Sequence, residues 1–132
     1  MKLITRDTDY AIRAICYLAK HKKRVVSVPE LIQKLKVPRP FLRKLLQILS
    51  KNGVVRSRKG IGGGFVLGAP AHKIYIMRIM GIFQGEFLLN ECFLKKIRCP
   101  HTGGCILKKK ITRIESYVAR ELNSITIHSL LQ

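Results

Sequence analysis

The first repeating pattern of apolar and polar residues lies near the start of the chain, over residues 8–20. Apolar side chains recur there at helical spacing, which predicts an amphipathic α-helix. Thr8 or Asp9 is expected to cap its N-terminus, and the basic residues that follow suit its C-terminal end. The residues expected on its inward face are Ala11, Ile15 and Leu18.

Two short helical patterns follow within residues 28–53 and are joined by a tight connection. Pro29 suits the first turn of one helix, and Pro38 and Pro40 suit the start of the second. The apolar residues of the second pattern fall on one side, so this side is expected to pack on the core. They are Phe41, Leu42, Leu45, Ile48 and Leu49.

The other side of this second helix is basic or polar. Such a face is typical of a recognition helix, because the buried side fixes the helix to the core. Arginine and glutamine on the exposed side can then reach the hydrogen-bonding groups of base edges in the major groove. The residues expected to contact DNA in this way are Arg39, Arg43, Lys44 and Gln47.

Two short strands are expected next, over residues 54–57 and 65–67, with the sequence GIGGG in the turn between them. After a helix and a helix-turn-helix, such a hairpin is the wing of a winged helix-turn-helix. The same glycines could belong to a phosphate-binding loop of a nucleotide enzyme, but no Gly-Lys-Ser/Thr sequence follows them. The basic residues expected to extend from the wing toward phosphates or a minor groove are Arg56, Arg58 and Lys59.

A further helical pattern occupies residues 72–85, with Ile76, Ile79, Met80 and Phe83 expected to face the core.

The last pattern begins at residue 106 and predicts a helix of roughly 18 residues, about 27 Å long. A single apolar stripe on so long a helix needs something to cover it. We therefore expect an antiparallel or crossing pair of helices across the two-fold axis of a homodimer. Packing of the stripe within its own subunit is the alternative. The stripe consists of Leu107, Ile111, Ile114, Val118 and Leu122.

Together these elements predict a mainly α-helical fold with a small β-hairpin wing, a winged helix-turn-helix followed by a long C-terminal dimerisation helix. Residues 1–85 would form the DNA-binding region, residues 86–105 a cysteine loop and residues 106–132 the dimerisation helix and tail, within one compact domain. The apolar stretches reach only about half of the roughly 20 residues that a membrane-spanning helix needs. Asp7 and Asp9 lie where a signal peptide would be apolar, so a cytoplasmic protein is expected.

The formal net charge of +19 is large for a chain of 132 residues, and such a field attracts polyanions. No acidic residue lies between Glu30 and Glu86. Nucleic acid and an anionic membrane both fit this charge, but the helix-turn-helix and wing favour double-stranded DNA with a near-palindromic operator. A basic RNA-binding module would use the charge without needing these two elements. An enzyme is not expected, because the sequence contains no Ser/His/Asp set, carboxylate pair or phosphate-binding loop.

Cys92, Cys99 and Cys105 are separated by six and five residues. This spacing is too wide for the Cys-x-x-Cys pair of a zinc ribbon and suits a loop around an iron-sulfur cluster. Cys105 would stand at the N-terminus of the long helix, where backbone N–H groups favour a thiolate. Oxidant-sensing thiols or a zinc site are the alternatives. Cys16, alone on the first helix, is expected to be a small core residue.

Several motifs resemble one known family. They are TDYAIRA near the start, KNGVV, RKGIGGGFVL, and a three-cysteine loop before a long terminal helix. In this order they resemble the winged-helix regulators that include IscR, NsrR and RirA, the Rrf-two family, and the resemblance covers nearly all of the chain. It implies a bacterial DNA-binding homodimer, which in many members carries an iron-sulfur cluster that senses iron, redox state or nitric oxide.

The resemblance also implies a fourth ligand for the cluster. In IscR-like members a histidine three residues beyond the last cysteine serves, but this chain has Lys108 there. In NsrR-like members a carboxylate near the N-terminus of the partner subunit serves, and the matching residue is Asp9, with Asp7 close by. His101 and Glu91 are local alternatives. The choice between a two-iron and a four-iron cluster stays open.

Overall fold

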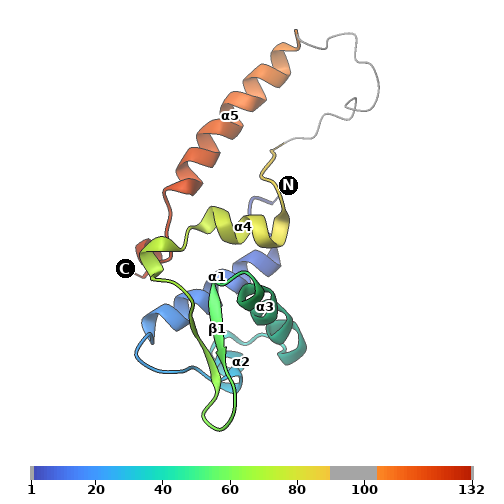
Figure 1. Cartoon of the computed structure of the whole chain (residues 1–132). Helices are drawn as coiled ribbons and strands as arrows, with labels where there is room; N and C mark the ends of the chain where they lie inside the picture. Colours follow the sequence, from blue (N-terminus) through green and yellow to red (C-terminus); the bar gives the residue numbers. More distant parts are fainter. Residues whose placement is uncertain (1, 90–103, 132) are drawn as a thin grey trace.

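The computed structural model describes residues 2–89 and 104–131. In chain order the elements are α1 (Arg6–Lys20), α2 (Val28–Leu35), α3 (Arg39–Lys51), β1 (Val55–Arg58), β2 (Gly64–Leu67), the 3-10 helix η1 (Ala71–Lys73), α4 (Ile76–Gln84), α5 (Ile106–Asn123) and the 3-10 helix η2 (His128–Leu130). The first three helices and the hairpin form a body, α4 lies across it, and α5 projects on the side opposite the hairpin (Figure 1). The predicted fold class is confirmed.

The first helix begins earlier than the sequence predicts, because Thr5 caps it and neither Thr8 nor Asp9 does. The Thr5 hydroxyl accepts a hydrogen bond from the backbone N–H of Thr8 at 3.4 Å. The backbone N–H of Thr5 itself donates to Oε1 of Gln84 at 2.9 Å. Asp9 instead accepts a hydrogen bond from Nε of Arg13 at 2.9 Å, one turn along the helix. The cap was predicted wrongly because its position depends on contact with the end of α4.

The inward faces of α1, α3 and α4 contribute to a single core. All three predicted inward residues of α1 are buried. On α3 the buried face is centred differently from the prediction, since Leu46 is buried whereas Phe41 and Ile48 are only half-buried. Cys16 packs against this core, and burial raises the pKa of its thiol, so it stays protonated as a small core residue.

The wing is a two-stranded antiparallel hairpin in which Val55 lies opposite Leu67. A third segment joins it, because the backbone of Val26 pairs with that of Phe65. The N–H of Val26 donates to the Phe65 carbonyl at 3.1 Å, and the N–H of Phe65 donates to the Val26 carbonyl at 2.8 Å. The wing is therefore tied to the linker between α1 and α2.

The helix predicted over residues 72–85 is shorter in the structure, because α4 begins at Ile76. Ile74 and Tyr75, the two residues before it, are held extended by the chain that follows α5. The N–H of Ile127 donates to the Ile74 carbonyl at 2.8 Å, and the N–H of Ile76 donates to the Ile125 carbonyl at 3.0 Å. Ile127 is fully buried, so the end of the chain belongs to the core. Of the predicted inward residues of α4, Ile76, Ile79 and Met80 are buried and Phe83 is half-buried.

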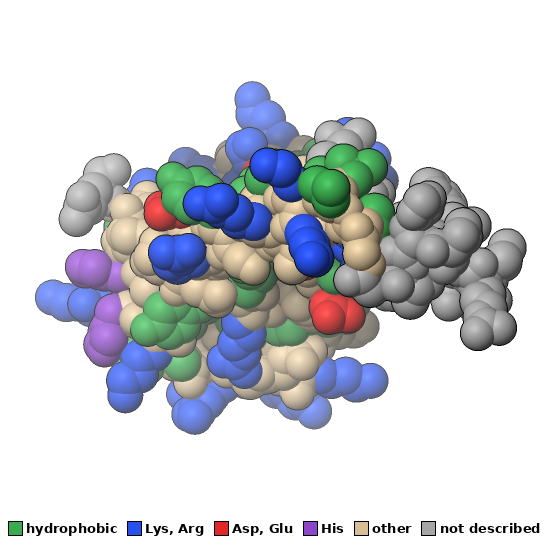
Figure 2. All heavy atoms as spheres, turned by 90° about the horizontal axis from the view of Figure 1, so that it is seen from above, with side chains coloured by type: hydrophobic (Ala, Val, Ile, Leu, Met, Phe, Trp, Pro, Cys, Tyr) green, Lys and Arg blue, Asp and Glu red, His purple; other side chains and the backbone are tan. Residues whose placement is uncertain are grey.

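The long C-terminal helix has the predicted length, since α5 contains 18 residues. Within the chain only its last apolar residue, Leu122, is buried. Leu107 and Ile114 are 67% and 52% exposed, and Ile111 and Val118 are half-buried. Apolar side chains consequently lie open among lysine and arginine side chains on the face seen in Figure 2. Among the described helices, none is both long and apolar enough to cross a membrane.

Candidate nucleic-acid interface

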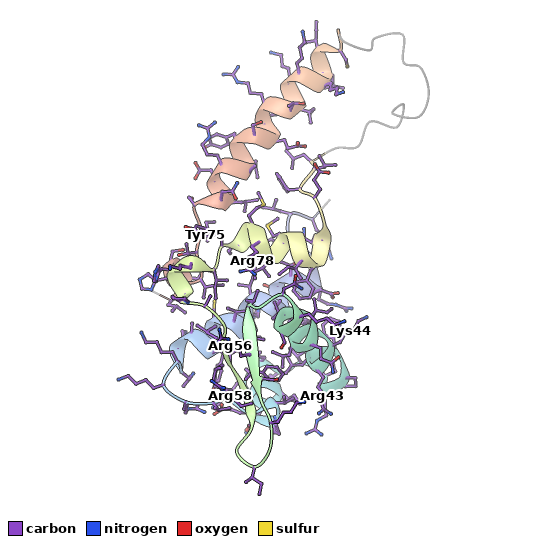
Figure 3. All side chains as sticks on the ribbon, in the orientation of Figure 1. Arg43, Lys44, Arg56, Arg58, Tyr75 and Arg78 are labelled. Atoms are coloured by element: carbon purple, nitrogen blue, oxygen red, sulfur yellow. The ribbon has the colours of Figure 1, made fainter. Side chains whose placement is uncertain are left out.

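The outward face of α3 carries the four polar or basic side chains that the sequence predicts to reach DNA. They are Arg39, Arg43, Lys44 and Gln47, and all four are exposed. On the opposite face four leucines of α3 are buried in the core, which fixes the direction of the exposed face. Arg43 and Lys44 lie on the half of the molecule away from α5 (Figure 3).

The N-terminal end of α3 is anchored to α1 by aromatic contacts. The ring of Phe41 meets the ring of Tyr10 edge to face, with 5.6 Å between centroids. The guanidinium carbon of Arg6 lies 5.4 Å from the centroid of the same Phe41 ring. Edge-to-face and cation-π contacts of this kind favour one arrangement of the packed rings. Phe41 therefore holds the start of α3, and with it Arg39 and Arg43, against the first turns of α1.

The connection between α2 and α3 makes the two helices a helix-turn-helix. Lys36 ends α2 with a left-handed backbone, φ 54° and ψ 44°, and its N–H donates to the Ile32 carbonyl at 2.8 Å. Val37, the next residue, is buried, so the turn packs against the core. At the other end of α2, Ser27 accepts a hydrogen bond from the backbone N–H of Glu30 at 3.3 Å. Sequence alone predicts the tight connection but not the strained conformation at Lys36.

The wing brings a second set of basic residues to the same half of the molecule as α3 (Figure 3). Arg56 and Arg58 lie on β1, Lys59 follows in the turn, and all three side chains are exposed. Two separate elements, a helix and a hairpin, thus present cations on one end of the body, while α5 projects from the other end (Figure 1). This arrangement suits a duplex, in which a helix reads one groove and a wing meets the phosphates beside it.

The carboxylate nearest to this surface in the sequence, Glu30, is neutralised by a salt bridge. Nη2 and Nη1 of Arg24 donate to its two carboxylate oxygens at 2.8 and 3.0 Å. These hydrogen bonds lower the pKa of Glu30 below its usual value, with the charge of Arg24 adding to the effect. The next acidic residue along the chain is Glu86. The basic face therefore carries no carboxylate of its own from α3 through the wing.

The sequence gives no site role to Arg78, yet the structure connects it to α3. Nη2 of Arg78, on α4, donates to the backbone carbonyl of Asn52 at 2.6 Å. Asn52 is the C-terminal cap of α3, and its own Nδ2 donates to the Ile48 carbonyl at 2.8 Å. The only signal in the sequence was the position of Arg78 as a lone charge within an apolar helix.

Two of the four predicted metal ligands, Cys92 and Cys99, lie outside the described residues, as do the alternatives His101 and Glu91. Cys105 is a free, half-buried thiol that caps α5, and its sulfur accepts a hydrogen bond from the backbone N–H of Lys108 at 3.4 Å. The sulfur at this helix end is free to act as a metal ligand.

The fourth predicted ligand, Asp9, is on α1, with its side chain 48% exposed and paired to Arg13. Figure 1 shows that the start of α5, where Cys105 lies, is at the far end of the projecting helix and away from α1. Within residues 2–89 and 104–131, no three histidine, cysteine, aspartate or glutamate side chains gather in a set that could hold a metal ion. The fold of one chain thus does not bring Asp9 to Cys105.

Comparison with known proteins decides the family. A model for the Rrf2 family, described as "Iron-dependent Transcriptional regulator", matches residues 4–132. The chain belongs to the Rrf2 family. It is a winged helix-turn-helix regulator of transcription that binds DNA, and it is not an enzyme.

Similar proteins cover nearly all of this Rrf2 member. A protein of Aquifex aeolicus assigned as an HTH-type transcriptional regulator is 36% identical over 132 residues, with 98% of this chain and 92% of the relative aligned. The HTH-type transcriptional regulator NsrR of Oceanobacillus iheyensis is 28% identical, with 98% and 89% aligned. The structure of CymR, the global cysteine regulator of B. subtilis, has a TM-score of 0.83 at 24% identity and covers 99% of this chain and 97% of its own.

Proposed function

We propose that this Rrf2 regulator reads a near-palindromic operator with the exposed face of α3 and holds the flanking phosphates with its wing. The observation that carries this proposal is that α3 and β1, two elements without any carboxylate, present exposed cations together on one end of the body. Arg43 and Gln47 would reach base edges, since both project from the side of α3 opposite its buried leucines. Chromosomal DNA as the target would place the protein in the cytoplasm.

The operator would be bound by a homodimer joined through α5. Apolar residues at helical spacing on this helix remain open to solvent within one chain, and Ile106, Leu107, Ile114 and Tyr117 are all more than half exposed. A second copy of the stripe would cover them, because a two-fold axis brings identical faces together. Two recognition helices about 34 Å apart could then meet successive major grooves.

An engineered charge tests this dimer. Replacing Ile114 with glutamate would bury an unpaired carboxylate in the proposed interface, so sedimentation velocity should show monomers at micromolar concentration. The matched control is Ser116→Glu, which adds the same charge to an exposed position of the same helix and should leave dimers. Circular dichroism should show equal helix content for both variants. Monomeric wild-type protein in low salt would contradict the proposal.

We further propose that operator binding is controlled by an iron-sulfur cluster. Cys92, Cys99 and Cys105 would hold it, with Asp9 of the partner subunit as the fourth ligand. Cys105 supports this ligand set, because its half-buried sulfur is free and stands at the N-terminus of α5, directly after the other two cysteines in the sequence. The carboxylate of Asp9 is partly exposed, and the fold of one chain does not bring it to its own Cys105. This supports Asp9 as a ligand to the cluster of the partner subunit. When bound, the cluster supplies a centre that responds to iron supply, redox state or nitric oxide.

Control of DNA binding would follow from the position of Asp9 on α1, the helix against which α3 packs through Phe41 and Tyr10. A ligand donated from α1 across the dimer would fix the two DNA-binding regions relative to each other, and its release would let them move. Protein purified without oxygen should be brown and contain iron and sulfide. It should also bind a selected operator with an affinity that differs from that of the apoprotein at fixed salt. Equal affinities would exclude the switch.

A second candidate is a regulator whose cysteines act as thiol redox sensors or hold zinc. The same Cys105 favours this candidate too, because a free thiol that is only half-buried can be oxidised or can bind zinc. Analysis of iron, sulfide and zinc in anaerobic protein separates the two. Colourless protein with stoichiometric zinc, or a metal-free protein that loses operator binding on oxidation, would favour this second function.

A further inference from the structure

The tip of the wing carries one large apolar side chain, and it is fully exposed. This side chain is Ile61, which lies between Gly60 and Gly62 in the turn from β1 to β2. Among the large apolar residues that the structure describes as exposed, Ile61 has the highest exposure. Lone apolar residues are common on protein surfaces. Ile61 differs from most of them because the backbone of its turn and the residues beside it determine where its side chain points and what it can contact.

The turn fixes Ile61 at a corner. The N–H of Gly63 donates to the Gly60 carbonyl at 3.0 Å, which closes a four-residue turn with Ile61 at its second position. Gly62, at the third position, has φ +76°, the left-handed value that a type II turn requires. A Cβ at Gly63 would overlap the backbone of Arg58, so the turn closes tightly at its base. Ile61 thus points outward from a turn that is closed by a backbone hydrogen bond.

Glycines make this tip thin. Only Lys59 and Ile61 carry side chains between the last pair of the hairpin, Arg58 opposite Gly64. A minor groove of B-DNA is about 6 Å wide and excludes broad elements. A hairpin end that is mostly bare backbone can enter it. The cations of Arg58 and Lys59 are exposed where β1 passes into the same tip, so they are available to phosphates beside the groove.

We propose that Ile61 is an apolar wedge that the wing inserts into the minor groove of the operator at a deformable pyrimidine-purine step. This inference rests on the proposed contact of the wing with DNA. Partial unstacking of a base step by an inserted isoleucine bends the duplex toward the major groove. Steps such as TA and CA unstack most readily, so the wedge would add sequence preference at a position without hydrogen bonds to bases.

The main alternative for an exposed apolar side chain is contact with another protein. A single isoleucine flanked by glycines and cations offers far less surface than a stable protein interface needs. The exposed cations of Arg58 and Lys59 beside Ile61 would repel the equally basic wing or α3 of a second copy. The surroundings therefore favour DNA.

The experiment uses the full-length protein and a duplex about three helical turns long that this protein selects from a random library. Hydroxyl-radical footprinting locates the minor groove beneath the wing. The adenine of each TA or CA step there is replaced in turn by 2-aminopurine, whose fluorescence increases when the base unstacks. Wild-type protein should increase the fluorescence at one such step, and this increase is the brightening that the variants are compared by. Ile61→Ala should abolish the brightening at saturation and weaken operator binding about tenfold, because less apolar surface leaves water. Ile61→Leu should retain both.

Lys59→Ala is the matched control in the same turn. It should weaken binding and reduce the salt slope by about one, as expected for one lost phosphate contact, while the brightening at saturation persists. Equal brightening with wild-type protein and Ile61→Ala, or no brightening at any step, would overturn the wedge while leaving the wing contact in place. An unchanged salt slope in both Lys59→Ala and Arg58→Ala would instead remove the wing contact and the wedge with it.

Discussion

Arg78 donates a hydrogen bond from Nη2 to the backbone carbonyl of Asn52, 2.6 Å away, and so joins α4 to the C-terminal cap of α3. The last carbonyls of a helix carry partial negative charge, which a guanidinium stabilises. Asn52 and Gly53 also begin the turn into β1, so this contact lies where the recognition helix passes into the wing. The α4 helix in turn contacts α5. Arg78 therefore connects the DNA-binding elements to the half of the molecule that contains the long helix.

Replacing Arg78 with methionine should lower the free energy of unfolding by about 1 kcal/mol, because a charged donor to a helix end is lost from an exposed site. Operator affinity should fall as α3 loses its link to α4. Urea denaturation and fluorescence anisotropy with labelled operator measure the two effects. Lys73→Met, which removes one positive charge from an exposed position nearby in the sequence, should leave stability unchanged. If Lys73→Met lowered stability and operator affinity as much as Arg78→Met, the loss of a positive charge, and not of the hydrogen bond to Asn52, would be the cause.

Replacing Gly64 with alanine should detach the wing from the linker between α1 and α2. A Cβ at Gly64 would overlap the carbonyl of Val26, which accepts the hydrogen bond from Phe65. Unfolding free energy should fall by about 2 to 4 kcal/mol, since backbone cannot move aside cheaply. Amide hydrogen exchange at Phe65 should accelerate relative to the core helices.

The matched control for this substitution is Gly62→Ala, in the same hairpin. Nothing lies within 4 Å of a Cβ at Gly62, so its cost comes only from the left-handed backbone, φ +76°, and should be about 1 kcal/mol. If Gly62→Ala destabilised the protein as much as Gly64→Ala, the contact with Val26 would not be the cause.

Substitutions on α3 and on the wing should have different effects on DNA binding. Arg43→Ala should cost about 1 to 3 kcal/mol on the selected operator and little on unrelated duplex, because a base contact is lost. Arg58→Ala should weaken both duplexes alike and reduce the slope of log affinity against log salt by about one. Titrations at several salt concentrations give both quantities. If the Arg43 variant kept its full preference for the operator sequence, Arg43 would not contact bases, and a different face of α3 would lie against the DNA.

Acid should remove the contribution of Glu30 to stability. Hydrogen bonds from Arg24 lower the pKa of Glu30 in the folded protein. A group with a lowered folded pKa stabilises the fold above its unfolded pKa, and this contribution is lost as pH falls through the folded value. Wild-type protein should therefore be more stable than Glu30→Gln near neutral pH, and the difference should vanish well below about pH 4. Thermal unfolding at several pH values, in low salt, measures it.

Glu121→Gln is the control for the pH experiment, because it also removes one carboxylate from this strongly basic chain but at an exposed position of α5. Its stability difference from wild type should be smaller near neutral pH. High salt should reduce the effect of Glu30→Gln, since the pair with Arg24 is partly exposed to solvent. A difference that persisted unchanged at acid pH would show that Glu30 acts through packing.

Local patterns in the sequence determined much of this protein. The spacing of apolar residues predicted α1, α3 and α5, because one face of each helix must be buried or covered whatever its neighbours are. The glycines after Arg58 predicted the hairpin, since few other residues adopt the backbone that its turn needs. The exposed cations of α3 followed from its helical spacing, and those of β1 from their position in the wing. Motifs and their order were enough to identify the family, which the comparisons confirmed.

Contacts between distant parts of the chain decided the rest. Thr5 caps α1 because Gln84 holds its backbone, α4 starts at Ile76 because residues after α5 keep the preceding stretch extended, and Val26 joins the wing through Phe65. Each of these depends on hydrogen bonds between residues far apart in sequence, whose energy exists only once the core has brought them together. The spacing of apolar residues does not indicate which distant residues will be hydrogen-bond partners, so only the tertiary structure could identify these contacts.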